Sequence, residues 1–242
     1  VDILSNGRFQ LGLGSGYRPY EFEGLGIDFD SRRERQAEAV DLILQGFHEK
    51  RVNSNGKYFQ FKMDEGYEIF PQPIQQPHPP FYMGAGTPDS IRLAAQKGFG
   101  LMQGSLPSVE KLSENIEFYK KHMKDAPAPL NQNPCFGQFD CVRMVYVAPT
   151  DAQAKAESEA AITYHMKTFL SGDTAGYLGD VTEKDSESQF AYDNLVDTTI
   201  VHGSPDTVIR RIEELRAIGI TSLMLHYPPY YGVQQCLDML RM

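Results

Sequence analysis

The sequence has no tryptophan, only three cysteines and no long apolar run. Cys135, Cys141 and Cys236 form no C-x-x-C pair, so we expect neither a disulfide framework nor a zinc ribbon, and we expect a reducing, cytoplasmic location. No run approaches the ~18 apolar residues of a membrane span, so we expect no membrane partner. Without tryptophan, the large aromatic side chains are 14 phenylalanines and 13 tyrosines, which suffice for a sizeable core.

Positive charge is also scarce. The chain has 23 lysines and arginines against 32 aspartates and glutamates, which gives a net charge of -9 and a pI near 5.2. No basic field is available to neutralise phosphates, so we expect no nucleic-acid partner. The 41% hydrophobic and 23% charged residues are typical of a soluble folded protein and exclude a disordered or fibrous chain.

Strand-like and helix-like patterns alternate along the chain, which is typical of βα units and an α/β fold. Proline-rich residues 70–80 predict an extended strap, and Asn55-Gly56 predicts a hairpin turn. Ser31 and Glu34 predict a capping box at a helix start. Residues 170–198 show no clear period and predict an insertion or loop. The predicted strands span 9–14, 81–85, 99–103, 139–147 and 220–226, and the predicted helices span 31–47, 87–98, 108–124, 151–169 and 204–219.

The first candidate site follows the first predicted strand. Gly14 and Gly16 alternate with Ser15 and Tyr17, and glycines there let a flat ligand lie against the backbone at the carboxyl end of a strand. The alternative is that these glycines only relieve crowding or form the turn, because the pattern does not match the dinucleotide fingerprint G-x-G-x-x-G. Arg18 beside Tyr17 offers a cation and a ring to an anionic or conjugated ligand, or else packs within the loop.

The second candidate site follows the second predicted strand. Gly86, Thr87 and Ser90 lie where a strand turns into a capped helix, and free N–H groups, the helix dipole and two hydroxyls favour a phosphate there. The alternative is an ordinary N-cap without a ligand. Residues 202–205, with Ser204 before a proline, have similar chemistry and form a rival phosphate site.

The six histidines are scattered without metal-ligand spacing, so we expect no metal centre. His226 ends the last predicted strand and is a weak candidate for a catalytic group, the alternative being a hydrogen-bonded structural histidine. Glu21 and Arg32, on either side of a turn, predict an ion pair that braces the loop.

Several segments, in this order and spacing, resemble the bacterial luciferase-like flavin-dependent monooxygenase family. Their order covers nearly the whole chain. They are residues 4–9 (LSNGRF), 11–17 (LGLGSGY), 21–22 (EF), 29–32 (FDSR), 56–59 (GKYF), 71–80 (PQPIQQPHPP), 94–100 (AAQKGFG) and 203–208 (GSPDTV).

The resemblance implies a (β/α)8 TIM barrel of the luciferase-like type, one domain over residues 1–242, that binds reduced FMN or, in sister groups, F420. It implies that Gly14 lies beside the reactive face of the ring and that Ser15, Gly16 and Tyr17 run along the phosphate and ribityl end. It implies a phosphate cradle at Gly86, Thr87 and Ser90. Ser15 replaces an arginine of luciferase, so this position supplies less charge for the phosphate.

The same resemblance implies a monooxygenase that uses reduced FMN and O2 to oxygenate a small organic substrate, with a flavin reductase as a supplier of reduced FMN and a homodimer at full length. The alternatives are an F420-dependent oxidoreductase and a non-catalytic flavin-binding protein. We expect an incomplete barrel that lacks about the first three βα units, with the assisting catalytic group in the missing part. The chain alone would then be inactive, because these units and the assisting group would be missing. Its inward-facing side chains would also lack partners, so it should aggregate or melt without cooperativity; these are Leu11, Leu13, Tyr82 and Met83.

Overall fold

The computed structural model describes residues 1–128, 130–169, 190–227 and 231–241. The strands are β1 (Leu11–Leu13), β2 (Asn53–Asn55), β3 (Gln60–Lys62), β4 (Phe81–Gly84), β5 (Gly100–Gln103), β6 (Phe139–Val147), β7 (Val201–Gly203) and β8 (Ser222–His226). The helices are α1 (Pro19–Gly24), α2 (Arg32–Glu49), α3 (Pro88–Gln96), α4 (Val109–Met123), the 3-10 turn η1 (Leu130–Gln132), α5 (Asp151–Phe169), α7 (Tyr192–Thr198), α8 (Pro205–Ala217) and α9 (Val233–Met239).

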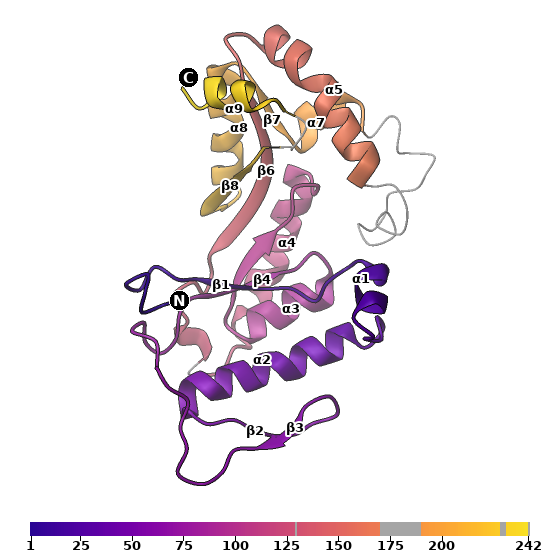
Figure 1. The fold of residues 1–242 in the computed structure, drawn as a ribbon. Helices are drawn as coiled ribbons and strands as arrows, with labels where there is room; N and C mark the ends of the chain where they lie inside the picture. Colours follow the sequence, from indigo (N-terminus) through magenta and orange to yellow (C-terminus); the bar gives the residue numbers. More distant parts are fainter. Residues whose placement is uncertain (129, 170–189, 228–230, 242) are drawn as a thin grey trace.

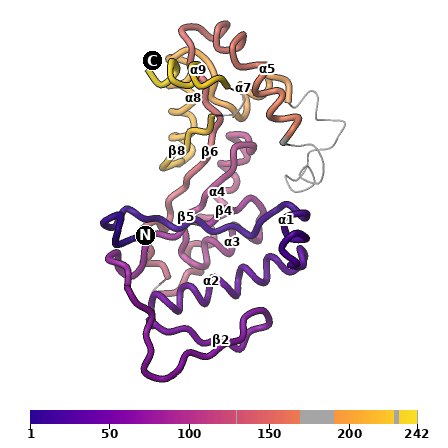
Figure 2. Tube along the Cα trace, in the orientation of Figure 1, coloured from indigo at the N-terminus to yellow at the C-terminus, as the bar shows by residue number. Residues whose placement is uncertain are grey.

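Six strands form one parallel sheet, a half-barrel in which β1, β4, β5 and β6 are successive neighbours. The long strand β6 pairs with β8 over Asp140–Met144 and with β7 over Val145–Val147. Figure 1 shows β6 running from the lower part of the molecule, with β1, β4 and β5, to the upper part, with α5, α8 and α9. The tube in Figure 2 shows the same path, with the N-terminus near the middle of the molecule and the C-terminus at its top.

One face of the sheet packs against helices. Leu11 and Leu13 lie on this face with Phe81, Met83 and Leu101, and they contact a core that α2, α3 and α4 complete. We expected Leu11, Leu13 and Met83 to point into the barrel, and this prediction was wrong because the helices cover the face that carries these side chains. Met83 and Phe81 are fully buried there.

Glycine is common on the opposite, inner face. Gly12, Tyr82 and Gly100 are register partners across three strands, so they share that face. A Cβ atom at Gly100 would lie 2.6 Å from the Tyr82 ring, which shows that this ring fills the space above Gly100. Tyr82 is the one member of the four predicted inward-facing residues that does point inward.

The structure confirms all five predicted strands and five predicted helices, with ends that shift by a few residues. Strand β6 and helix α5 have the predicted bounds. Strand β7 was not predicted from the sequence, because three residues are too few to show a strand period. The short helices α1 and α7 were not predicted either.

Part of the predicted insertion at 170–198 lies outside the described residues, namely 170–189. Within the remainder, Tyr192–Thr198 form α7, so an irregular segment was a wrong prediction there. Tyr192 and Leu195 bury their side chains against Ile162 and Met166 of α5. A tertiary contact, not a local period, therefore stabilises this helix.

The predicted capping box at the start of α2 does not form. The Ser31 hydroxyl donates to the Asp28 carbonyl at 2.6 Å instead of capping α2. The Glu34 carboxylate accepts hydrogen bonds from Lys57 and from the Tyr58 hydroxyl, each at 2.7 Å. These partners belong to the hairpin loop that follows Asn55, so Glu34 fixes the confirmed β2–β3 hairpin to α2.

No helix among the described residues combines the length and the apolar character that crossing a bilayer requires.

Candidate functional site

Three neighbouring strands of the half-barrel are followed at their carboxyl ends by exposed glycines. Gly14 follows β1, Gly86 follows β4 and Gly104 follows β5. The pairing of Leu13 with Met83 and of Gly84 with Met102 brings these strand ends together. A Cβ atom at any of the three following glycines would meet no atom of the described residues within 4 Å. The strand ends therefore present bare backbone to open space, which suits the close approach of a flat ligand.

Helix α3 begins directly after Gly86 with the predicted N-cap. The Thr87 N–H donates to Ser90 Oγ at 3.1 Å, and the Ser90 hydroxyl donates back to the Thr87 carbonyl at 2.9 Å. Thr87 Oγ1 lies 2.9 Å from Ser90 Oγ, so the two hydroxyls are hydrogen-bonded to each other. The Gly86 N–H has no hydrogen-bond partner in the described part of the chain. A phosphate there would accept from this N–H and lie near the positive end of the α3 dipole.

At the rival phosphate site, the start of α8, a carboxylate of the protein itself occupies the helix N-terminus. Asp151 Oδ1 accepts the Ser204 N–H at 2.6 Å, and Asp151 Oδ2 accepts the Thr207 hydroxyl at 3.0 Å. These bonds, the Ser204 N–H first, lower the pKa of Asp151. A carboxylate at a helix N-terminus takes the place that a phosphate would need, so α3 is the better site of the two.

Arg143 of β6 holds the loop after β5 by hydrogen bonds to the backbone carbonyls of that loop. Its side chain is 1% exposed, and its guanidinium donates to the Pro107 carbonyl at 2.8 Å, the Gly104 carbonyl at 3.3 Å and the Ser105 carbonyl at 3.4 Å. Burial lowers the pKa of Arg143. Neither Arg143 nor Gly104 was predicted from the sequence. Gly104 follows a predicted strand in the same way as Gly14, and that pattern was a signal for it.

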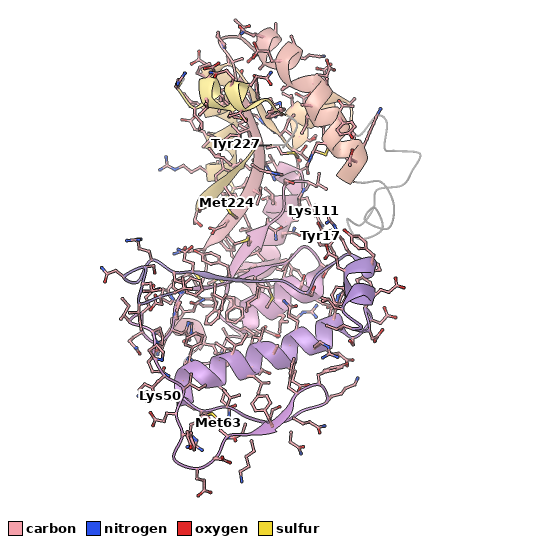
Figure 3. All side chains as sticks on the ribbon, in the orientation of Figure 1. Tyr17, Lys50, Met63, Lys111, Met224 and Tyr227 are labelled. Atoms are coloured by element: carbon pink, nitrogen blue, oxygen red, sulfur yellow. The ribbon has the colours of Figure 1, made fainter. Side chains whose placement is uncertain are left out.

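Several contacts of the residues after Gly14 are with neighbours in sequence. The Ser15 hydroxyl donates to the Gly16 carbonyl at 3.5 Å. Gly16 has a φ of +76°, and a Cβ there would lie 2.7 Å from the Phe22 ring, so glycine is needed for α1 to pack on this loop. The Arg18 guanidinium lies 5.2 Å from the Tyr17 ring centroid. In the view of Figure 3, Tyr17 is seen between α1 and the first turn of α4, which carries Lys111.

The predicted ion pair between Glu21 and Arg32 does not form. Glu21 pairs instead with Arg18, three residues away, at 3.4 Å. The Arg32 guanidinium lies 3.7 Å from the centroid of the Phe29 ring and donates to the Phe29 carbonyl at 2.9 Å. Each side chain thus has a partner close in sequence, which explains why the longer-range pair is absent.

His226 ends β8 and lies beside His165 of α5, with 5.7 Å between the ring centroids. Burial, and then the neighbouring His226, lower the pKa of His165. Strands β4, β5 and β6 lie between β1 and β8. The structure therefore places His226 at the end of a strand that does not pair with the strand before Gly14, and its catalytic role stays a prediction.

Comparison with known families identifies the family of this α/β protein. Residues 1–222 match the model of the luciferase-like monooxygenase family. The chain belongs to this family. The predicted family membership is confirmed, and the half-barrel is that of luciferase-like proteins.

Two curated relatives differ in chemistry. This luciferase-like chain is 28% identical over 245 residues to the 5,10-methylenetetrahydromethanopterin reductase of Archaeoglobus fulgidus, covering 94% of this chain and 70% of the relative. It is 29% identical over 172 residues to the oxygenase component of the flavin-dependent trigonelline monooxygenase of Acinetobacter baylyi, covering 68% of this chain and 44% of the relative. The chain thus spans less than half of the second relative.

Solved structures show the same fold. The monooxygenase RslO1 of Streptomyces bottropensis aligns with a TM-score of 0.74 and 21% identity, over 99% of this chain and 68% of that one. The oxygenating constituent of 3,6-diketocamphane monooxygenase of Pseudomonas putida, in complex with FMN, aligns with a TM-score of 0.70 and 20% identity, over 99% and 70%. The coenzyme F420 dependent tetrahydromethanopterin reductase of Methanopyrus kandleri aligns with a TM-score of 0.67 and 18% identity, over 99% and 74%. The fold thus occurs with both flavin-like cofactors.

Proposed function

We propose that this luciferase-like protein binds FMN at the three glycine-ended strands and takes part in a monooxygenase reaction with O2 and a small organic substrate. The observation that carries the proposal is the open backbone at Gly14, Gly86 and Gly104, where a Cβ would meet no atom of the described part of the chain within 4 Å. A flat ring can lie directly against exposed backbone, and any larger side chain at these three positions would occupy the space of the ring.

Each end of the cofactor has a matching group on this chain. The Gly86 N–H and the N-terminus of α3 would hold the phosphate, and Gly14 would lie against the ring. Arg18, whose pKa is raised by the neighbouring Tyr17 and by hydrogen bonding to Tyr20, would add positive charge at the mouth. When bound and reduced, FMN supplies the electrons that activate O2.

Two similar proteins favour FMN over other flavin-like cofactors. The trigonelline monooxygenase is described as flavin-dependent, and the diketocamphane monooxygenase was solved with FMN. A flavin reductase that supplies reduced FMN, and assembly as a homodimer, are part of the proposal. The second candidate is an F420-dependent oxidoreductase, which the match of 94% of this chain to the Archaeoglobus fulgidus reductase favours.

Cofactor titration separates the two candidates. Fluorescence titration of the protein with FMN and with F420 should give tighter binding of FMN, and the reduced-FMN complex should consume O2 with incorporation of labelled oxygen into substrate. Tight binding of F420 with no affinity for FMN would replace the monooxygenase proposal with the reductase one. No binding of either cofactor would contradict both.

A further inference from the structure

Behind the Gly86 loop, two buried amide side chains form a relay that ends on a backbone carbonyl. Asn115 of α4 donates through Nδ2 to Gln103 Oε1 at 2.7 Å. Gln103, at the end of β5, donates through Nε2 to the Ala85 carbonyl. Asn115 is 5% exposed and Gln103 is 1% exposed, so water does not compete for these bonds.

The Ala85 carbonyl, the last acceptor, fixes the orientation of both amide groups, those of Gln103 and Asn115. A backbone carbonyl only accepts hydrogen bonds, so Gln103 must turn its NH2 group toward Ala85. Its oxygen then faces α4, and Asn115 must present its own NH2 group to that oxygen. The relay therefore has one direction, from α4 through β5 to Ala85.

The relay reaches the backbone directly before the candidate cradle. The Ala85 N–H donates to the Met102 carbonyl at 3.2 Å, and its carbonyl accepts from Gln103, so both polar groups of Ala85 are held by β5 and its end. Gly86 follows, with its N–H unpartnered in the described chain. Fixing Ala85 thus fixes the plane of the peptide that carries the Gly86 N–H.

We propose that Asn115 and Gln103 are positioning residues that aim the Gly86 N–H at the phosphate of the cofactor. This inference rests on the proposed function, because it assumes that a phosphate binds at Gly86. Neither side chain touches the cofactor, since both lie on the helix side of the sheet. A purely structural role of the two residues would change stability alone, so the test needs a measurement that stability alone does not change.

That measurement is the preference for FMN over riboflavin, which lacks the phosphate. Asn115→Asp and Gln103→Glu each replace an amide NH2 by a carboxylate oxygen of the same shape. In the Asn115→Asp variant the new carboxylate accepts but does not donate, so Gln103 turns its NH2 group toward α4 and its oxygen faces the Ala85 carbonyl. We expect each variant to lower the ratio of FMN affinity to riboflavin affinity about tenfold, the size of one hydrogen bond to a charged group. Affinity for riboflavin should change much less.

Asn133→Asp is a matched control at the other end of the sheet. Asn133 is also a buried asparagine, and it donates to the carbonyls of Phe81 and Gly98 at 3.1 and 2.7 Å, at the amino end of β4. This variant should lower the melting temperature and leave the FMN to riboflavin ratio unchanged.

Two results would overturn the inference, and they are distinguishable. An unchanged ratio in either relay variant that folds would leave the phosphate site in place and refute the positioning role. Equal affinity of the wild-type protein for FMN and riboflavin would refute the phosphate site of the proposed function, and the positioning role with it. If F420 binds instead, the same comparison uses F420 and its deazaflavin core without the phosphate side chain.

Discussion

Asp151 accepts the backbone N–H of Ser204 at 2.6 Å, across 53 positions of sequence, and so places a carboxylate at the N-terminus of α8. The pairing of β6 with β7 brings the two residues together, since β6 leads into α5 and β7 leads into α8. The Ser204 N–H, which the sequence suggests is available to a ligand, therefore already has an acceptor within the protein.

Asp151→Ala should lower the free energy of unfolding by about 1 kcal/mol, the usual effect of losing a side-chain cap. Because hydrogen bonds lower the pKa of Asp151, its contribution is present above the ordinary aspartate pKa and is lost as pH falls through the lowered value. Denaturant titrations at neutral and acidic pH should show the wild-type and variant stabilities converging in acid. Asp206→Ala removes a carboxylate from the first turn of α8, the helix start that Asp151 caps, and should lower the free energy of unfolding less.

Gly14→Leu should abolish FMN binding while the protein stays folded. No atom of the described residues lies within 4 Å of the added Cβ, so the leucine side chain should cost little stability until a ring needs that space. Titration with FMN and circular dichroism check the two halves of the prediction. Gly24→Leu, at an equally open position in α1, should bind as the wild type does. Normal FMN affinity in the Gly14 variant would place the ring elsewhere.

Replacing both Thr87 and Ser90 by alanine should raise the dissociation constant of FMN about tenfold, because the capped turn that holds the Gly86 loop loses its hydrogen bonds. Riboflavin affinity should change little. Ser108→Ala removes a comparable cap, the bond from the Lys111 N–H at the start of α4, and should not affect either ligand. Equal loss of both ligands in the double variant would argue for general loosening of the site.

Stability should fall as the solution is acidified from about pH 6.5 toward pH 3, in part because of His202. Burial lowers the pKa of His202 to about 3, and its ring nitrogens face Ser158 Oγ at 2.9 Å and the Tyr231 hydroxyl at 3.2 Å. The unfolded chain binds this proton near pH 6.5, so in that window it holds more protons than the folded chain. One group contributes a slope of up to about 1.4 kcal/mol per pH unit. His202→Gln should flatten the measured curve by up to this amount, and parallel curves would contradict the assignment.

Local patterns were enough for most of the fold. The apolar run of β6 and the long helical pattern of α5 predicted their bounds correctly, because strand and helix periods depend on nearby residues. The Thr87–Ser90 turn was predicted for the same reason, since both partners lie within one helical turn. In contrast, Ser31 and Glu34 also have capping-box spacing, yet Glu34 bonds to Lys57 and Tyr58 of the hairpin.

The sequence also did not predict which face of each strand the helices cover. The alternation of leucine and glycine from Leu11 to Gly14 shows that the two residue types occupy opposite faces, but not which face the helices cover. The structure puts the leucines against α2, α3 and α4 and leaves the glycines on the inner face. Buried Gln103 and Asn115 gave no signal in the sequence, because their pairing depends on where α4 packs against β5.

By itself, the sequence determined that strands alternate with helices, that two of the strands end in the candidate glycines Gly14 and Gly86, and that α3 and α8 both begin with capping residues. Only the tertiary structure decided which helix start stays available. At α8 the carboxylate of Asp151 comes from another βα unit and accepts the N–H of the N-cap Ser204. At α3 the matching Thr87 N–H donates to Ser90 within the same turn, and no described residue accepts the Gly86 N–H that precedes it. The physical reason is that a cap within one turn follows from neighbouring residues, while a partner from a distant segment exists only once the strands have paired.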